Sequence, residues 1–349
     1  MDIVREYKPL LYGDETPFFS IIIVSYNYEK TILRALEAIK NQTYDKYQIV
    51  LVDNGSTDNT NEIIQKFIQN NKDLYITHII IEKNEGLPKG RNLGIKNACG
   101  KYLIFNDADD WMDRRFLEII YKASRNGCAD RISVQFRDVS PEGKVLQVRN
   151  YVKGMSPWYI TLLQGNAFRR DIFVKNNILV PDTFEDDLYI SLQVLGHAKR
   201  CVIVRKTLYN YYVNNNSTSG INSITEKERI GAILDDVINC VDPVRRIVSH
   251  NNWEYLEYQM IKCYYNLIFN YNRNRSYKDI SDVYHYLNNK IKKYDANYLN
   301  NKKIKLSFNG DRIYGRLLTY FFVLSERLHV MVPILWMYIF LSKILYFNV

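Results

Sequence analysis

The first part of the chain alternates short apolar runs with stretches in which apolar residues recur every three or four positions. Runs rich in β-branched residues predict buried strands, and the longer spacing predicts amphipathic helices. The predicted strands cover residues 19–25, 47–53, 75–82 and 101–106. The predicted helices lie near residues 32–39, 63–68, 88–98 and 113–126. This alternation predicts an α/β fold with a mostly parallel sheet and helices on both faces.

From about residue 130 the pattern changes to shorter strands around two helices. The predicted strands are 131–138, 144–149, 202–205 and 208–213, and the helices lie near 170–176 and 185–196. Residues 214–220 have the composition of a linker. Further helices are predicted near 225–248, 253–271, 277–293 and 311–346. We expect an N-terminal extension (1–17), an α/β domain (18–220) and a helical C-terminal region (221–349).

Polar clusters directly follow the first four predicted strands. They are Ser25-Tyr26-Asn27, Asp53-Asn54-Gly55-Ser56, Asn84-Glu85-Gly86 and Asp107-Ala108-Asp109-Asp110. In an open parallel sheet the carboxyl ends of the strands meet at one edge, and ligands bind there. The sequence therefore predicts a single site at this edge.

Three acidic clusters are candidates for chemistry. Asp107 and Asp109 can converge on a hard divalent cation that also binds phosphate oxygens, although the same cluster could simply cap the next helix. Asp53 can accept hydrogen bonds from a nucleobase or a ribose, although its surroundings also favour an ordinary turn. Asp186, in Phe184-Glu185-Asp186-Asp187, can act as a general base, although acidic residues are also common at helix starts.

Together these segments resemble the inverting glycosyltransferases of family 2, which have the GT-A fold. The resemblance begins at I-I-I-V-S-Y-N and V-D-N-G-S-T-D, and continues through N-E-G-L-P-K-G-R-N to F-N-D-A-D-D-W. It includes Q-G-N-A-F-R-R-D-I-F, ends near F-E-D-D-L-Y, and covers about residues 18–213. The order and spacing of these blocks are much more specific than a lone D-x-D. The resemblance implies a metal-dependent enzyme that moves a sugar from a nucleotide diphosphate to a hydroxyl.

The resemblance also implies roles for individual residues. Those implied for nucleotide binding are Ser25, Tyr26, Asn27, Asp53, Arg91 and Asp107. Asp109, with Asp107, would ligate Mn²⁺ or Mg²⁺, and Asp186 would be the catalytic base. The donor and acceptor pocket would include Trp158, Gln164-Gly165-Asn166, Glu185 and Asp187.

The sequence departs from the family pattern at two places. Asn54 stands where an Asp is often found, and Asp187 makes the assignment of the base ambiguous by one position. The C-terminal portion of the family varies widely, so residues 221–349 inherit no role.

Two other functional classes compete with this interpretation. A non-catalytic sugar-nucleotide or polysaccharide-binding protein would not need carboxylates at both the metal and the base positions. A nucleotidyltransferase would need a glycine-rich basic loop after the first strand, and S-Y-N-Y-E-K contains no glycine. We therefore expect a hexosyl- or N-acetylhexosaminyl-transferase acting on a saccharide or lipid-linked glycan in cell-surface polysaccharide or glycoconjugate synthesis. We favour UDP over GDP from its frequency in the family, and the oligomeric state stays open.

Composition and charge bear on location. The five cysteines are scattered and the N-terminus lacks an apolar core, which favours a cytoplasmic protein with reduced thiols and no structural zinc. The net charge is +9, and residues 273–316 hold eleven Lys or Arg against four Asp or Glu. No nucleic-acid recognition motif accompanies them. A solvated helical face would explain this stretch as well as an anionic partner would.

The uncharged stretch Val330–Leu341 is too short to span a bilayer. It could lie in the membrane interface, or it could be a core helix or an oligomer contact. Its aromatic content and the nearby basic stretch favour peripheral contact with the cytosolic face of a membrane.

Overall fold

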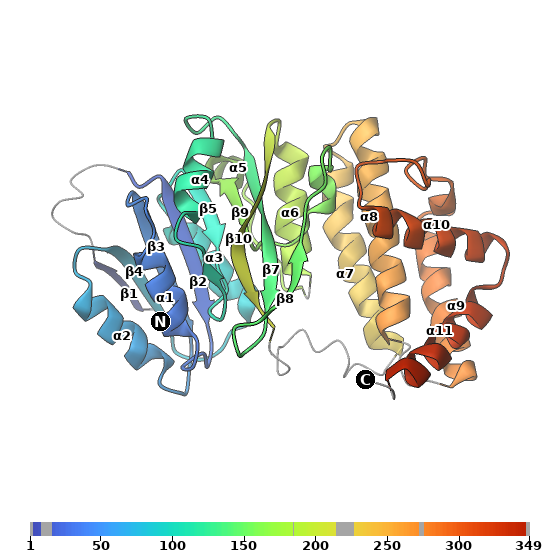
Figure 1. The fold of residues 1–349 in the computed structure, drawn as a ribbon, viewed down its shortest axis with the longest axis horizontal. Coiled ribbons are helices and arrows are strands. Elements are labelled where there is room, and N and C mark those ends of the chain that lie inside the picture. The colour runs from blue at the N-terminus through green and yellow to red at the C-terminus, as the bar shows by residue number, and fades with distance from the viewer. Residues whose placement is uncertain (1–2, 8–15, 184, 214–226, 272–275, 347–349) are drawn as a thin grey trace. The chain divides into compact units, whose positions relative to one another are not determined.

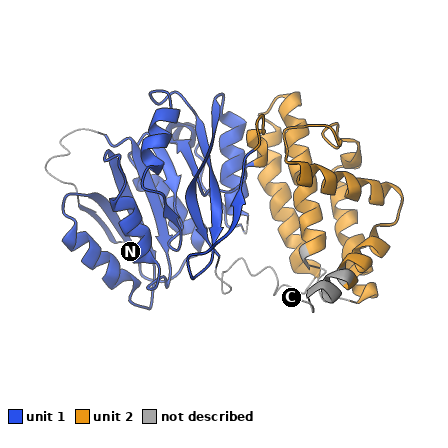
Figure 2. Ribbon diagram, viewed as in Figure 1, with its two compact units in different colours: residues 1–151, 160–215 blue, residues 152–159, 216–349 orange. Residues whose placement is uncertain are grey.

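The computed structural model describes the chain except for residues 1–2, 8–15, 184, 214–226, 272–275 and 347–349. The chain divides into two compact units (Figure 2). The first contains residues 1–151 and 160–215, and the second contains residues 152–159 and 216–349. The predicted linker at 214–220 lies outside the described residues. The short segment 152–159 belongs to the second unit, which the sequence did not indicate.

The first unit is built on one mixed sheet (Figure 1). Its strands are β1 (Ile3–Tyr7), β2 (Phe19–Ser25), β3 (Tyr47–Asn54), β4 (Tyr75–Ile81), β5 (Tyr102–Phe105), β6 (Trp111–Met112), β7 (Arg131–Val139), β8 (Val145–Arg149), β9 (Asn166–Arg169) and β10 (Cys201–Tyr212). The order is β1-β4-β3-β2-β5-β9-β7-β10-β6, with β8 paired to β7. Strands β4, β3, β2 and β5 are mutually parallel, as predicted.

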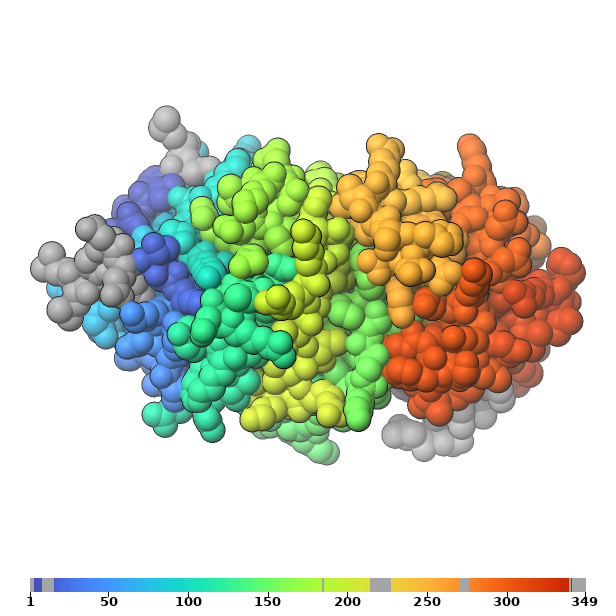
Figure 3. Space-filling view, turned by 90° about the horizontal axis from the view of Figure 1, so that it is seen from above, coloured from blue at the N-terminus to red at the C-terminus, as the bar shows by residue number. Residues whose placement is uncertain are grey.

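Helices cover both faces of this sheet. They are α1 (Ile32–Lys40), α2 (Thr60–Asn70), α3 (Leu87–Asn97), α4 (Phe116–Ala123), α5 (Arg170–Lys175) and α6 (Asp186–His197). A hydrophobic core lies on each face of the sheet, and alternate residues of β2 point into the two cores. Ile21 and Ile23 pack with α1, α2 and α4, whereas Ile22 packs with α3, α5 and α6. Figure 3 shows β10 at the surface beside α4, with which it is in contact.

Helix α3 lies unusually close to β2 because it presents glycines to the sheet. A Cβ at Gly94 would lie 2.3 Å from Ile22 Cγ2, and one at Gly90 would lie 2.5 Å from Val24 Cγ1. The intervening Arg91 is thereby held near the carboxyl end of β2.

Four strands differ from the sequence-based prediction. The exposed β1, the two-residue β6 and the four-residue β9, which runs antiparallel between β5 and β7, were not predicted. They are too short or too polar to give a periodic signal. The two strands predicted at 202–205 and 208–213 form the single strand β10, whose register shifts between Val204 and Tyr209.

The second unit is helical. It contains a 3₁₀ turn at Pro157–Tyr159, α7 (Lys227–Arg245), α8 (His250–Tyr271), α9 (Tyr277–Tyr294), a 3₁₀ turn at Tyr298–Asn300, α10 (Ile313–Arg327) and α11 (Met331–Tyr346). Across the described residues, every helix is too short or too polar to serve as a membrane span.

The prediction of one helix over residues 311–346 is wrong. The chain turns after α10 because His329 adopts a left-handed φ of 56°. The amide of His329 donates to the Glu326 carbonyl at 3.1 Å, and the amide of Val330 donates to the Ser325 carbonyl at 3.0 Å. These two bonds are the Schellman motif that commonly ends helices, with a histidine in the usual glycine position.

Candidate active site

The loops that follow β2 and β3 are joined through Asn27. Its backbone has a φ of 60°, and its side-chain oxygen accepts hydrogen bonds from the amides of Thr57 at 2.8 Å and Asp58 at 3.4 Å. Its own amide donates to Ser56 Oγ at 3.1 Å. The structure thus brings the clusters Ser25–Asn27 and Asp53–Ser56 together, with Ser25 buried beside β3 and Tyr26 exposed.

Asp53 is the last residue but one of β3, and its side chain is buried. It accepts a hydrogen bond from the Ser56 amide at 3.1 Å, which is the turn that its sequence context favours. Burial raises the pKa of the Asp53 carboxyl, although hydrogen bonds from Ser56 oppose this shift. The neighbouring Asn54 donates to Asn84 Oδ1 and to the Gly86 carbonyl, each at 3.0 Å. An ionised Asp could not donate these two bonds, so Asn54 suits this loop.

The carboxylates of the acidic loop after β5, residues 107–110, lie in two different environments. Asp110 is buried, and it accepts hydrogen bonds from the Tyr209 hydroxyl at 3.0 Å and the Tyr212 amide at 2.7 Å. It therefore anchors the loop to β10. Asp107 and Asp109 remain partly exposed and are available to a ligand.

The surroundings of Asp107 and Asp109 favour a bound cation. Burial, together with the charge of Asp107, raises the pKa of Asp109 to about 6. Burial also raises the pKa of Asp107, although the Arg91 charge opposes this shift. A divalent cation would offset the repulsion between the two carboxylates. The described residues contain no cluster of three or more His, Cys, Asp or Glu arranged for a metal.

Two residues beside this loop had no signal in the sequence. The half-buried Arg34 of α1 donates to the Asp109 carbonyl at 2.6 Å, and its guanidinium lies 4.1 Å from the Trp111 ring centre and 4.5 Å from that of Tyr212. Burial raises the pKa of Tyr28, and the negative charges of Asp109 and Asp107 raise it further. Tyr28 is therefore within electrostatic reach of the candidate metal ligands.

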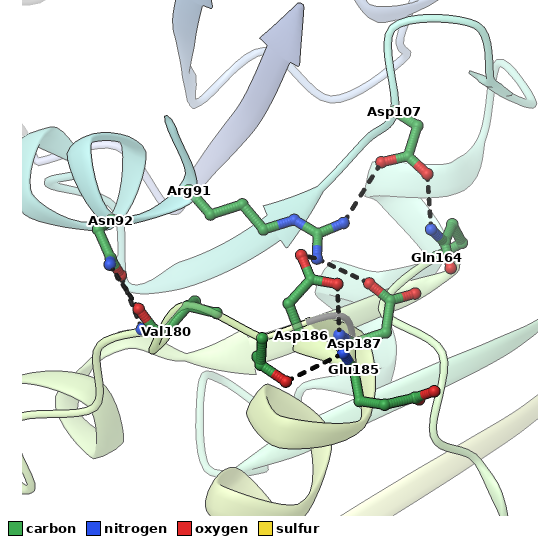
Figure 4. Close-up of polar contacts among 9 residues, drawn as sticks. Arg91, Asn92, Asp107, Gln164, Val180, Glu185, Asp186 and Asp187 are labelled. Carbon is green, nitrogen blue, oxygen red and sulfur yellow. Dashed lines mark hydrogen bonds and ion pairs between the residues drawn. The ribbon is translucent and has the colours of Figure 1, made fainter. Parts of the chain in front are cut away.

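Arg91 links the acidic loop to the start of α6 (Figure 4). Its Nη1 donates to both Asp186 and Asp187, at 2.8 Å in the case of Asp187 Oδ1. Its Nη2 lies 3.8 Å from Asp107 Oδ1. Arg91 is only 4% exposed, and although burial alone would lower its pKa, the carboxylates of Asp187, Asp186 and Asp107 raise it overall. Arg91 therefore stays charged, and it contacts carboxylates from two distant parts of the chain, the acidic loop after β5 and the start of α6.

Asp186 and Asp187 are the first residues of α6, where the helix dipole favours negative charge. Burial raises the pKa of Asp186 to about 6, a shift that Arg91 opposes and that Asp187 and Asp107 strengthen. The side chain of the preceding Glu185 points away from Arg91 (Figure 4). A carboxyl with this pKa is ionised at neutral pH but remains able to take up a proton.

Asn92, the residue after Arg91, holds the segment that leads into α6. Asn92 donates to the Val180 carbonyl at 2.8 Å and accepts from the Val180 amide at 2.7 Å. This pair joins α3 to the segment before α6 (Figure 4). The K-G-R-N motif thus contributes two residues to the site. Arg91 pairs with the carboxylates, and the side-chain amide of Asn92 holds the segment before α6.

The remaining predicted residues have different surroundings. Gln164 reaches the site and donates to Asp107 Oδ2 at 2.6 Å. Asn166 is fully buried, and its side-chain oxygen accepts from Arg131 and Ser133, so it supports the interior beside β7. Trp158 is buried in the second unit. Lining of a sugar pocket by Trp158 or Asn166 stays a prediction.

Comparison with known proteins identifies the class. The family model described as "Glycosyl transferase family 2" matches residues 20–180, which include β2, the acidic loop and Val180. An uncharacterized glycosyltransferase of Haemophilus influenzae is 31% identical over 194 residues, which cover 54% of this chain and 75% of that protein. The chain therefore belongs to glycosyltransferase family 2, and it has the GT-A fold.

Other similar proteins match this chain in different ways. The glycosyltransferase GlyA of Streptococcus pneumoniae is 38% identical over 224 residues, which cover 58% of this chain and 31% of that protein. The first three curated relatives are matched over 66%, 31% and 63% of their own lengths. The crystal structure of residues 1–349 of S. aureus TarS in complex with UDP has a TM-score of 0.65 and 19% identity. It covers 92% of this chain and 90% of that one, which shows a shared fold.

Proposed function

We propose that this glycosyltransferase inverts the configuration at the anomeric carbon of its donor in a single displacement. The acceptor hydroxyl would attack this carbon on the face opposite the leaving nucleoside diphosphate. The observation that carries the proposal is the contact of the buried Arg91 with Asp107, in the acidic loop after β5, and with Asp186, at the start of α6. The sugar donor and the acceptor hydroxyl could then be held in one site.

Asp186 is the proposed general base. Its pKa of about 6 lies close to neutral pH, where a base is effective, and Arg91 fixes the position of its carboxylate. Asp187 contacts the same Arg91 nitrogen and is the alternative base. Asp186 would remove the proton of the acceptor hydroxyl as the new glycosidic bond forms.

Asp109 and Asp107 are the proposed ligands of Mn²⁺ or Mg²⁺. A bound cation would stabilise the negative charge that grows on the leaving diphosphate. Arg34 holds the Asp109 backbone and Gln164 holds the Asp107 carboxylate, so the chain orients both ligands itself.

We propose a UDP-linked hexose or N-acetylhexosamine as the donor. TarS, which shares the fold, binds UDP in its crystal structure. Ser25, Tyr26, Asn27 and Asp53 would form the nucleotide side of the site. The partners that the structure gives for Arg91 are carboxylates, so a direct contact between Arg91 and the nucleotide remains part of the proposal.

The biological setting is also a proposal. The acceptor would be a saccharide or a lipid-linked glycan, and the pathway would be cell-surface polysaccharide or glycoconjugate synthesis. The enzyme would act in the cytoplasm, at the cytosolic face of a membrane. The α/β domain at 18–220 would suffice for donor binding, and the region at 221–349 would serve the acceptor or the membrane.

A donor panel tests the proposal. UDP- and GDP-linked hexoses and N-acetylhexosamines are incubated with the enzyme, with Mn²⁺ or Mg²⁺ or with EDTA, and release of the nucleoside diphosphate is measured. We expect metal-dependent release from one or a few UDP-sugars, and about 10²–10⁴-fold less from Asp186→Asn at unchanged donor affinity. A protein that binds a donor without any release, in the presence of a broad acceptor pool, would instead be a sugar-nucleotide-binding protein.

A further inference from the structure

Helix α10 exposes a row of large apolar side chains. Ile313, Tyr314, Leu317, Phe321 and Leu324 recur at helical spacing, and Leu328 follows at the end of the helix. Tyr314 is 71% exposed and Leu317 is 51% exposed. The row is therefore a continuous apolar stripe on the surface of the second unit.

The opposite side of α10 is apolar as well. Phe322 packs against Tyr265 and Phe269 of α8, with ring centres 5.0 Å and 4.3 Å apart. A helix that already buries one apolar face should present polar residues on the other face if that face meets only water. The exposed stripe of α10 therefore indicates a non-aqueous partner.

A loop before α10 extends this surface. Leu306 and Phe308 are about half exposed. Arg316 of α10 donates to the Leu306 carbonyl at 2.7 Å, and its guanidinium lies 5.6 Å from the Phe308 ring centre. We call Leu306, Phe308 and the α10 stripe the apolar surface.

Within residues 302–340 the exposed charged side chains are all cations. Among residues 302–340 the acidic side chains are Asp311 and Glu326, and both are buried. Asp311 pairs with Lys262, and Glu326 accepts hydrogen bonds from Tyr264 and Asn288. Lys302 and Lys303 lie within 4 Å of Glu254, so they are partly neutralised.

Two other cations, Lys305 and Arg327, form no ion pair with a carboxylate among the residues that the structure describes. Lys305 and Arg327 are exposed, and the contact given for Arg327 is a backbone carbonyl. The surface thus combines apolar and aromatic side chains with cations and lacks an exposed acid among residues 302–340.

We propose that the apolar surface docks on an anionic lipid bilayer, with the α10 stripe in the interface and Lys305 and Arg327 near the headgroups. Aromatic and aliphatic side chains flanked by cations are what such an interface favours. A symmetric contact with a second copy is less favourable, because it would bring together the cations of residues 302–340, a stretch that exposes no acid. This surface includes α10, whereas the sequence analysis had pointed to Val330–Leu341 and the nearby basic stretch 273–316.

Vesicle co-sedimentation of the full chain tests this proposal. Vesicles of phosphatidylcholine with and without phosphatidylglycerol are compared at low and high salt. We expect binding to the anionic vesicles that weakens with salt. Leu317→Glu and Leu324→Glu should each weaken binding about tenfold or more, because each replaces an exposed leucine that would be buried in the bilayer interface. Lys305→Gln and Arg327→Gln should each weaken it about fivefold.

The β7–β8 hairpin of the first unit offers matched controls. Leu146 is 52% exposed and Lys144 is exposed. Leu146→Glu and Lys144→Gln should leave vesicle binding unchanged, and melting curves should show that all variants fold. Equal loss of binding in these controls, or no binding by the wild type, would overturn the proposal.

Two further measurements separate the alternatives. If light scattering shows an oligomer that Leu317→Glu dissociates, and no vesicle binding occurs, the surface is a contact between copies and the proposal is wrong. Hydrolysis of a soluble donor without vesicles should be unaffected by Leu317→Glu. Membrane docking and the proposed catalysis can therefore fail independently.

Discussion

Replacing Asp186 by Asn should inactivate the enzyme and make it more stable at the same time. The Asp186 carboxyl is buried at the start of α6, where its ionisation is unfavourable despite the contact with Arg91. Asn has nearly the same shape and stays neutral at every pH. Its side-chain oxygen can still accept the hydrogen bond from Arg91 Nη1.

The size of the effect follows from the pKa of Asp186. Burial raises this pKa from 3.8 to about 6, and each unit corresponds to about 1.4 kcal/mol. The burial of Asp186 therefore costs the wild type nothing below about pH 4 and about 3 kcal/mol of stability once the pH has risen through about 6. Asn cannot ionise, so the variant loses none of this stability between about pH 4 and pH 8. It should therefore be about 3 kcal/mol more stable than the wild type at pH 8.

Thermal melting across pH measures this difference. For a unit of about 200 residues, 3 kcal/mol corresponds to a rise in Tm of about 6–12 °C. The two proteins should melt together near pH 4 and separate above pH 6. Asp171→Asn is the control, because Asp171 is exposed and pairs only at 3.8 Å with Lys175. It should leave the Tm unchanged throughout.

Two results would refute this reasoning. An Asn variant that melts below the wild type at pH 8 would show that the ion pair with Arg91 stabilises the fold more than the burial of Asp186 destabilises it. An Asn variant that keeps full turnover would remove Asp186 from catalysis, and Asp187 would become the base to test.

Three other substitutions have defined outcomes. Arg91→Met leaves the buried Asp186 and the partly exposed Asp187 and Asp107 without their cation, so urea unfolding should show a loss of about 3–5 kcal/mol. An unchanged midpoint would contradict the role given to Arg91. Arg34→Met removes the hydrogen bond to the Asp109 carbonyl, so the Mn²⁺ concentration for half-maximal donor hydrolysis should rise about tenfold; a change in kcat alone would argue against metal positioning. Gly94→Ala places a methyl group 2.3 Å from Ile22 and should cost about 1–3 kcal/mol in urea unfolding, unless α3 can move outward.

The central sheet was predictable because its strands are buried on both faces and leave contiguous apolar runs. Because the carboxyl ends of parallel strands meet at one edge of a sheet, the sequence also predicted that Asp53 and Asp107 lie at the same edge. Strand β9 was not predictable, since its four residues are held by pairing with β5 and β7 and not by any local pattern. The end of α10 at His329 was missed because a left-handed histidine has no clear sequence signal.

The assignment of roles within the site needed the fold. D-A-D-D indicated carboxylate chemistry, but only the structure shows that Asp110 is an anchor for Tyr209 and Tyr212. Arg34 reaches Asp109 across 75 residues of sequence, so no local pattern could reveal it. Segment 152–159 joins the second unit through contacts such as the Ser156 amide with the Gly310 carbonyl at 2.9 Å, which are equally invisible in the sequence.

The central claim is that Asp109 and Asp186 act on one cation-bound nucleoside diphosphate sugar. Isothermal titration of UDP with and without Mn²⁺, on the wild type, Asp109→Asn and Asp186→Asn, tests it most directly. We expect metal-dependent UDP binding by the wild type and by Asp186→Asn, and loss of the metal dependence in Asp109→Asn. Metal-dependent binding that survives in Asp109→Asn would contradict the account.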